Sequence, residues 1–207
     1  MLYPIANTKF NETGPEVRCA MKGWQAIRFG AYAAGLFAVV CSVGAAEEDV
    51  YDHHSPQLHV SLAPRTPEQM AAFYEARGFG EEMIEVLRAQ CYITVLIENK
   101  SEDIVWLDLA QWRFSNADGE VQRPHRDRWK ERWQAMDIPL AHQSTFRWTL
   151  LPEQLDFPPG EREGGNIVLP RLGKPLKITA SFDTGERRTG RPIEVVFDEV
   201  HCAENPE

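Results

Sequence analysis

The stretch that decides the fold lies at residues 92–114 and reads YITVLIENKSEDIVWLDLAQWRF. From residue 92 onward the apolar pattern follows a period of two, which places successive side chains on opposite faces of a sheet. The pattern predicts one strand at 92–98 and a longer one at 104–114. The polar residues 99–103 between them predict a turn that connects the two strands.

The longer strand contains an irregularity. Its apolar side chains lie on one face as far as Leu109 and on the other face from Trp112 onward. Because side chains alternate along a strand, such a change needs one extra residue, and the pattern predicts a β-bulge near Ala110 and Gln111.

The chain before this stretch predicts a strand and two helices. Alternation of apolar and polar residues from Leu58 onward is typical of a half-buried strand. Thr66 then supplies a helix N-cap, Pro67 occupies the first helical position, and Gln69 completes a capping box. We therefore expect a short helical insertion at about 66–90.

The chain after this stretch returns to alternating segments separated by turn residues. We predict strands at 145–151, 167–169, 176–183 and 193–200. About seven short strands without a repeating strand–helix–strand pattern favour an antiparallel sandwich, with a barrel as the alternative. The sequence thus predicts a single, mainly β domain over residues 58–207, preceded by a flexible acidic lead-in at 47–57.

Turn and strand motifs follow one another in a recognisable order between residues 91 and 200. They are Ile93-Thr94-Val95, Asn99-Lys100-Ser101, Trp106-Leu107, Asp118-Gly119, Leu151-Pro152, Pro158-Pro159-Gly160-Glu161 and Gly165. This order resembles that of bacterial exported immunoglobulin-like domains of unassigned function. The resemblance implies an antiparallel immunoglobulin-like β-sandwich and implies little about function, because the motifs are turn chemistry.

The residues before the domain are typical of an export signal. Lys22 and Arg28 form a basic region, an uncharged run extends from Phe29 to Ala46, and small residues end it. We expect synthesis to start at Met21 and cleavage to remove residues 1–46, which places the mature protein in the periplasm or outside the cell. The alternative is an uncleaved signal that remains as a membrane anchor.

The mature part retains two cysteines, Cys91 and Cys202, of the four in the chain. In an oxidising compartment such a pair is expected to form one disulfide, which would close a loop of over 100 residues. The alternative is two buried free thiols. Their spacing excludes a redox Cys-x-x-Cys motif and a zinc cluster of cysteines.

The net charge restricts the class of partner. The whole chain carries 22 basic and 31 acidic side chains, and residues 1–46 contain four of the basic and two of the acidic ones. The net charge of the mature part is therefore near −11. Such a balance argues against a nucleic-acid binder and against a polybasic membrane association.

A basic segment rich in tryptophan predicts a surface helix at 125–136. Trp129 and Trp133 lie four residues apart, as on one apolar stripe that packs onto the sandwich. We interpret Arg126, Arg128 and Arg132 as candidate contacts to an acidic protein partner, because arginine is enriched in binding hot spots. The alternative is an insertion helix with a purely structural role.

The histidines near residue 54 form a candidate metal site. Asp52, His53, His54 and His59 offer imidazole and carboxylate ligands, which suit zinc or copper. On an extended chain His53 and His54 point to opposite sides, so both would bind one ion only if the backbone folded back. The alternative is a solvated segment without any cofactor.

Motifs of known catalytic sites are missing from the sequence. It contains no G-x-S-x-G elbow, no H-E-x-x-H and no glycine-rich phosphate loop. The sequence favours an exported, monomeric binding or accessory domain that contacts another envelope protein. A metal-handling protein is the second hypothesis, and an enzyme of unrecognised arrangement is the third.

Overall fold

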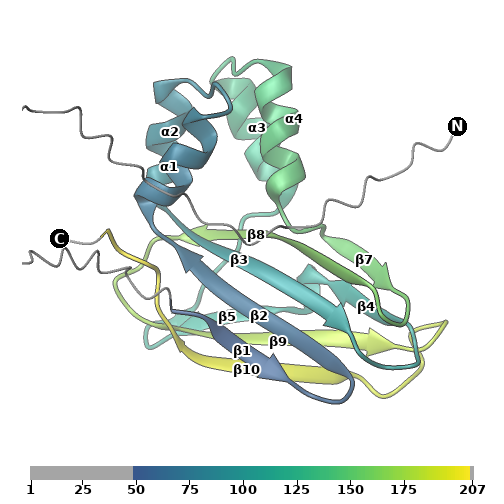
Figure 1. Ribbon diagram of the computed structural model, residues 1–207. Helices are drawn as coiled ribbons and strands as arrows, with labels where there is room; N and C mark the ends of the chain where they lie inside the picture. The colour runs from purple at the N-terminus through teal and green to yellow at the C-terminus, as the bar shows by residue number, and fades with distance from the viewer. Residues whose placement is uncertain (1–48, 206–207) are drawn as a thin grey trace, which may run out of the picture. The chain divides into compact units, whose positions relative to one another are not determined.

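The structure is a computed structural model, and it describes residues 49–205. They form a mainly β unit with two antiparallel sheets and four helices (Figure 1). The export segment expected at residues 1–46 lies outside the described residues. Within residues 49–205, no helix combines the length and the apolar character that a membrane span requires.

The first sheet has four strands in the order β1–β2–β3–β8, and each neighbouring pair is antiparallel. Its strands are β1 (Tyr51–His54), β2 (Leu58–Arg65), β3 (Gln90–Asn99) and β8 (Arg162–Pro170). Strand β1 lies within the segment 47–57, which was expected to be a flexible lead-in. That expectation is wrong for residues 51–54, because their backbone pairs with β2 and Tyr51 packs against the core.

The second sheet is built around β9, which has partners along both edges. Ile178 of β9 pairs with Phe114 on one side and with Phe197 on the other. The strands of this sheet are β4 (Val105–Asp108), β5 (Arg113–Asn116), β6 (Gly119–Glu120), β7 (Gln154–Phe157), β9 (Leu176–Thr184) and β10 (Ile193–Val200).

Strands β4 and β5 follow one path along β9 and are separated by a 3₁₀ turn, η1 (Leu109–Gln111). The side chain of Asp108 accepts a hydrogen bond of 3.1 Å from the backbone N–H of Ala110 and stabilises this turn. The irregularity was predicted at the right place, but the β-bulge was wrong. A whole 3₁₀ turn lets Trp112 and Phe114 face the same core as the apolar residues of β4.

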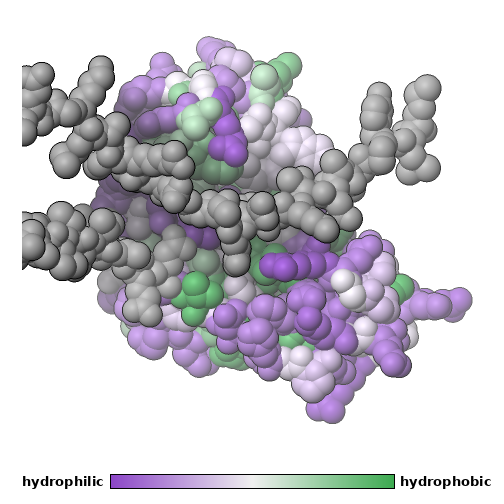
Figure 2. All heavy atoms as spheres, viewed as in Figure 1, coloured by the Kyte–Doolittle hydropathy of each residue, from purple (hydrophilic) through white to green (hydrophobic). Residues whose placement is uncertain are grey.

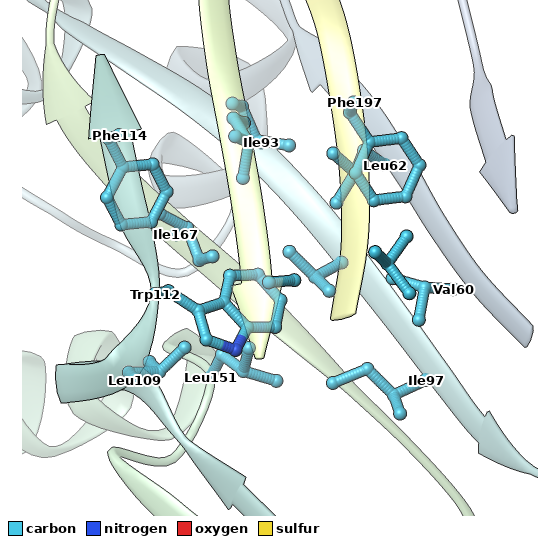
Figure 3. Close-up of a cluster of buried hydrophobic side chains, with 14 of the residues drawn as sticks. Val60, Leu62, Ile93, Ile97, Leu109, Trp112, Phe114, Leu151, Ile167 and Phe197 are labelled. Atoms are coloured by element: carbon cyan, nitrogen blue, oxygen red, sulfur yellow. The ribbon is translucent and has the colours of Figure 1, made fainter. Parts of the chain in front are cut away.

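The two sheets pack face to face around one hydrophobic core (Figure 3). In the close-up, Leu62 and Ile93 of the first sheet lie among Phe114 and Phe197 of the second. Each fully buried side chain of this size contributes about 1.5–3 kcal/mol to folding. This shared core makes the two sheets one sandwich-like unit, as the alternating sequence pattern predicted.

The helices form a layer on the outer face of the first sheet (Figure 1). They are α1 (Pro67–Glu75), α2 (Glu81–Arg88), α3 (Arg126–Ala135) and α4 (Leu140–Thr149). Tyr92 and Val168 point away from the sandwich core and pack into this helical layer, while their strand neighbours Ile93 and Ile167 pack inward. One face of the sheet therefore supports the sandwich and the other supports the helices.

The start of α1 agrees with the sequence prediction in detail. The Thr66 side chain accepts a hydrogen bond of 3.1 Å from the backbone N–H of Gln69, and the Gln69 side chain accepts one of 2.9 Å from the N–H of Thr66. The helix predicted at 125–136 is α3, with the His125 side chain as its N-cap.

The strand predicted at 145–151 is wrong, because residues 140–149 form α4. Phe146, Trp148 and Leu150 are spaced by two and imitate a strand. In the helix, Phe146 and Leu150 lie four residues apart on the buried side, whereas Trp148 is 85% exposed. The burial of this segment thus follows the helical period.

A disulfide joins Cys91 of β3 to Cys202, which follows β10, with the two Cα atoms 5.4 Å apart. It links the first sheet to the end of the second. Arg171 connects the same two segments, because it donates hydrogen bonds of 3.0 Å to the carbonyl oxygens of Ala203 and Gln90.

Candidate functional site

The candidate site is a pocket of about 140 Å³ between α3 and α4, here named the α3–α4 pocket. Each helix contributes residues at positions i, i+3, i+4 and i+7, which is one face of an α-helix. The lining residues are Arg126, Trp129, Lys130 and Trp133 of α3, and Leu140, Gln143, Ser144, Phe146 and Arg147 of α4, with Leu150 after it. Two facing helical stripes thus form the pocket.

The pocket has an aromatic floor. Trp129 and Trp133 stack with ring centroids 5.5 Å apart, and Phe146 contacts Trp133 edge-on at 5.3 Å. Trp129 is 4% exposed and Trp133 is 1% exposed. The prediction that the tryptophans pack as core is confirmed, and they give the pocket a rigid apolar base.

The pocket also contains cationic groups. A guanidinium nitrogen of Arg126 donates a hydrogen bond of 2.6 Å to the carbonyl oxygen of Arg147. Burial and the neighbouring charge of Arg147 lower the pKa of Arg126 from its ordinary value. The exposed Lys130 and Arg147 line the same pocket, so positive charge gathers above an apolar floor.

Two donors at this pocket have no acceptor among the described residues. They are the Nε of Arg126 and the indole Nε1 of Trp133, and both atoms are buried. Buried donors of native proteins are nearly always paired, so an unpaired one needs an explanation. An anionic acceptor entering the pocket would supply the missing partner for the Arg126 Nε.

Glu153 holds the beginning of α3 in place. Its carboxylate forms an ion pair with Arg123 and accepts a hydrogen bond of 2.9 Å from the backbone N–H of Arg126. A carboxylate at a helix N-terminus is favourable, because the free N–H groups there carry partial positive charge. Glu153 therefore fixes the position from which the Arg126 side chain reaches the pocket.

The three arginines singled out from the sequence are not brought together. Arg126 lines the α3–α4 pocket, whereas Arg128 and Arg132 line a separate hollow of about 450 Å³ together with Gln90. Arg128 pairs with Glu131 at 3.1 Å, and Arg132 lies over the Trp129 ring at 5.8 Å. Arg126 is thus the member of the set that lines the α3–α4 pocket, and it carries one of the two unpaired donors there.

Sequence reasoning missed the α4 side of the pocket. Leu140 is 75% exposed and Arg147 is exposed, yet the sequence pattern placed Arg147 in a strand. The available signal was the spacing of Phe146 and Leu150, which also fits a helix.

The segment 123–147, which includes α3 and most of α4, has a net charge opposite in sign to that of the whole chain. Residues 123–147 contain six basic and three acidic side chains, for a net charge of +3, while the whole chain has −9. In the view of Figure 2, small hydrophobic areas reach the surface among hydrophilic ones over the helices. This region is therefore a basic, partly apolar surface on an acidic protein.

A second hollow lies on the outer face of the first sheet, beside α1 and α4, and has a volume of about 700 Å³. The exposed Trp148 stands at its border. Three polar side chains that line it are joined by hydrogen bonds. The Nε of Arg65 donates to the Thr94 hydroxyl at 3.0 Å, and this hydroxyl donates to the Asn166 Oδ1 at 2.9 Å. These contacts pair the side chains of β2, β3 and β8 with each other.

The candidate metal ligands are divided by the pleat of β1. Asp52, His54 and His59 lie together, with one ligand atom of each within 4.8 Å of the others. His53 has Val60 as its cross-strand partner, which places it on the opposite face of β1. The expectation that the side chains of His53 and His54 point to opposite sides is therefore confirmed by the strand pairing.

Comparison with known proteins does not identify a family for this chain. No family model and no curated protein matches the chain. One similar solved structure is described as a "putative lipoprotein (ycdA)" from Bacillus subtilis, with a TM-score of 0.39 and 10% sequence identity. The aligned region covers 72% of this chain and 38% of that protein, so this chain matches well under half of its length.

Proposed function

We propose that this protein is an exported accessory domain of the cell envelope, and that the α3–α4 pocket binds an acidic side chain of a partner protein. The observation that carries the proposal is the buried Nε of Arg126, which has no acceptor among the described residues and belongs to a side chain that lines the pocket together with Trp129 and Trp133. An Asp or Glu carboxylate of the partner supplies that acceptor and neutralises the charge shared by Arg126 and Arg147.

Export to the periplasm or the medium is supported by two independent features. One is the basic, apolar and small-residue order from Lys22 to Ala46. The other is the disulfide between Cys91 and Cys202, because such bonds persist in oxidising compartments. N-terminal sequencing of envelope protein is expected to give Ala46 or Glu47 as the first residue, and an intact Met21 on a membrane-embedded product would refute cleavage.

The immunoglobulin-like character of the sandwich is part of the same proposal. Strand pairs β2–β3 and β3–β8 correspond to the A–B–E order of such domains, and β10–β9–β4 corresponds to the G–F–C order of the facing sheet. Domains of this architecture serve as binding modules in many unrelated proteins, so the proposal rests on the pocket rather than on the fold.

The charge distribution supports an acidic protein partner, and we propose that a monomer of this protein binds it. The net charge of +3 on residues 123–147 attracts an acidic surface, whereas the acidic remainder of the chain repels it. Complementary charge of this kind increases the rate of association and fixes its orientation. Leu140, exposed at the pocket, adds the apolar contact that an interface centre needs.

A photo-reactive amino acid at position 140 tests the proposal in the cell envelope. We expect one defined protein to be cross-linked from position 140 and not from position 196, where Val196 is 42% exposed on β10 of the second sheet. Arg126→Gln combined with Arg147→Gln is expected to abolish the cross-link, and added salt is expected to weaken it.

Arg128→Gln is the matched control, because it removes the same charge from α3 outside the α3–α4 pocket. It is expected to leave the cross-link intact. Equal cross-linking from positions 140 and 196, or a product that survives the double arginine replacement, would contradict the proposal.

A further inference from the structure

The β1–β2 hairpin places two histidines side by side. The backbone N–H of Ser55 donates to the carbonyl oxygen of Leu58 at 3.0 Å, which makes this the hydrogen-bonded pair that closes the turn. His54 and His59 are the next cross-strand pair, and in such non-hydrogen-bonded pairs the side chains lie closest. Their rings stack in the structure with centroids 3.9 Å apart.

A carboxylate joins the two imidazoles on the same face. Asp52 precedes His54 by two residues in β1, so the pleat points both side chains to the same side of the sheet. The Oδ1 of Asp52 lies 3.2 Å from the Nε2 of His59. Two neighbouring ligand atoms of a tetrahedral zinc ion are separated by about 3.4 Å, so these two atoms are already spaced as a ligand pair.

We propose that Asp52, His54 and His59 bind one divalent ion of the zinc and copper(II) class, independently of the α3–α4 pocket. A donor set of two imidazoles and one carboxylate binds these ions in preference to magnesium and calcium. The His54 ring reaches the ion by turning about its Cβ–Cγ bond, a torsion with broad freedom. Three protein ligands leave one position for water or for a ligand from a partner.

Glu98 is the positioning residue of this site. Its Oε2 lies 3.7 Å from the Nδ1 of His59, on the ring side opposite to Asp52. If this separation shortens to a hydrogen bond when an ion binds, the carboxylate favours the tautomer in which Nδ1 carries the proton and Nε2 is free to bind the metal. Glu98 also pairs with Lys100, and this contact together with His59 lowers the pKa of its carboxyl group.

The proposed ion links an edge strand to its neighbour. In the first sheet β1 has β2 as its strand partner, and Asp52 and His54 of β1 share the site with His59 of β2. Binding to the folded form raises the melting temperature, by about 5–10 °C at a free ion concentration one hundred times the Kd.

Calorimetric titration of the exported protein, purified without a histidine tag, with zinc and with copper(II) tests the site. We expect one ion per chain for at least one of the two metals. His54→Ala, His59→Ala and Asp52→Asn are each expected to reduce the affinity at least tenfold, and Glu98→Gln is expected to reduce it about 10- to 100-fold at unchanged stoichiometry.

His53→Ala is the matched control, because it removes an imidazole from the same strand on the other face. It is expected to bind the ion as the unchanged protein does. Circular dichroism monitors folding, and since His54 is exposed at the hairpin, its replacement decides the test even if the His59 variant unfolds. Absence of stoichiometric binding of both ions, or equal affinity in the His53 and His54 variants, would overturn the proposal.

Discussion

The side-chain amide of Asn99 donates a hydrogen bond of 2.7 Å to the carbonyl oxygen of Phe157, 58 residues further along the chain. The same NH₂ group donates to the carbonyl oxygen of Asp103 at 2.7 Å, and the amide oxygen accepts bonds from the N–H and hydroxyl of Ser101 at 2.9 and 2.7 Å. Asn99 is completely buried, and its amide uses all four bonding positions. It thereby connects the end of β3 in one sheet to the end of β7 in the other.

Replacing Asn99 with Leu is expected to lower the free energy of unfolding by roughly 2–5 kcal/mol. The carbonyl oxygen of Phe157 would lose its Asn99 donor and the N–H of Ser101 would lose its Asn99 acceptor, and each unpaired buried group costs about 1–3 kcal/mol. Urea denaturation measures the difference. Asn116→Ala is the control, because the Asn116 side chain accepts one bond in an exposed turn, and it is expected to cost about 1 kcal/mol or less. Equal losses for both variants would contradict this role of Asn99.

This residue also illustrates what the sequence could and could not predict. The turn at 99–103 follows from its polar residues, and the N-cap at Thr66 follows from three neighbouring residues. The bond from Asn99 to Phe157 depends on how two sheets pack, and nothing within a few residues of either partner encodes it. Local signals therefore predicted most of the elements, and long-range packing decided how they connect.

The disulfide between Cys91 and Cys202 is expected to contribute about 2–5 kcal/mol to stability, as native disulfides of small secreted domains do. Replacing both cysteines with Ser should lower the urea midpoint by a corresponding amount. Arg171→Ala is expected to destabilise the Ser variant more than the disulfide-bonded protein, since Arg171 bridges residues next to both cysteines. Additive effects of the two changes, measured as a double-mutant cycle, would rule out this coupling.

Two tryptophans of the helical layer are expected to respond in opposite ways to truncation. Trp133→Ala removes a side chain that is 1% exposed and is expected to cost about 3–5 kcal/mol. Trp148→Ala changes a side chain that is 85% exposed and is expected to alter stability by about 0.5 kcal/mol or less. Thermal and urea unfolding of both variants measure the contrast, and a large loss for Trp148 would mean that its ring is covered in solution.

The candidate pocket was accessible to sequence reasoning on one of its two sides. Trp129 and Trp133 lie at helical spacing among basic residues, and this marked α3 and Arg126. On α4, alternation of Phe146, Trp148 and Leu150 imitated a strand, so Arg147 was not considered. Which arginine of α3 lines a pocket depends on where α4 packs, and a single helix does not contain that information.

Gly165 lies where the loop after α4 crosses β8. A Cβ atom added there would approach the backbone nitrogen of Leu151 to 2.5 Å, and this backbone also pairs with Asn166. Gly165→Ala is therefore expected to cost about 1–3 kcal/mol by forcing β8 and the loop apart. Gly173→Ala is the control, since a Cβ there meets nothing within 4 Å. Equal urea midpoints for the two variants would show that the loop yields without strain.

Tyr74 connects α1 to α4 and is expected to make stability depend on alkaline pH. Burial raises the pKa of its phenol from the ordinary value of 10.0 to about 12. The Thr149 hydroxyl donates to the carbonyl oxygen of Phe146 at 2.7 Å, so the Tyr74 hydroxyl donates to Thr149, also at 2.7 Å, and must remain protonated to do so.

The unfolded chain releases this proton near pH 10, whereas the folded protein keeps it up to about pH 12. Above pH 10 the unfolded state binds fewer protons, so the free energy of unfolding decreases as the pH rises, by roughly 2–3 kcal/mol across this window. Urea denaturation at intervals from pH 8 to 12 follows the change.

Tyr74→Phe is expected to be less stable at neutral pH, through the lost hydrogen bond, but to show a shallower alkaline decline. Some decline remains, because burial also raises the pKa of Tyr92. Parallel curves for the Tyr74 variant and the unchanged protein would show that this phenol does not govern the alkaline transition.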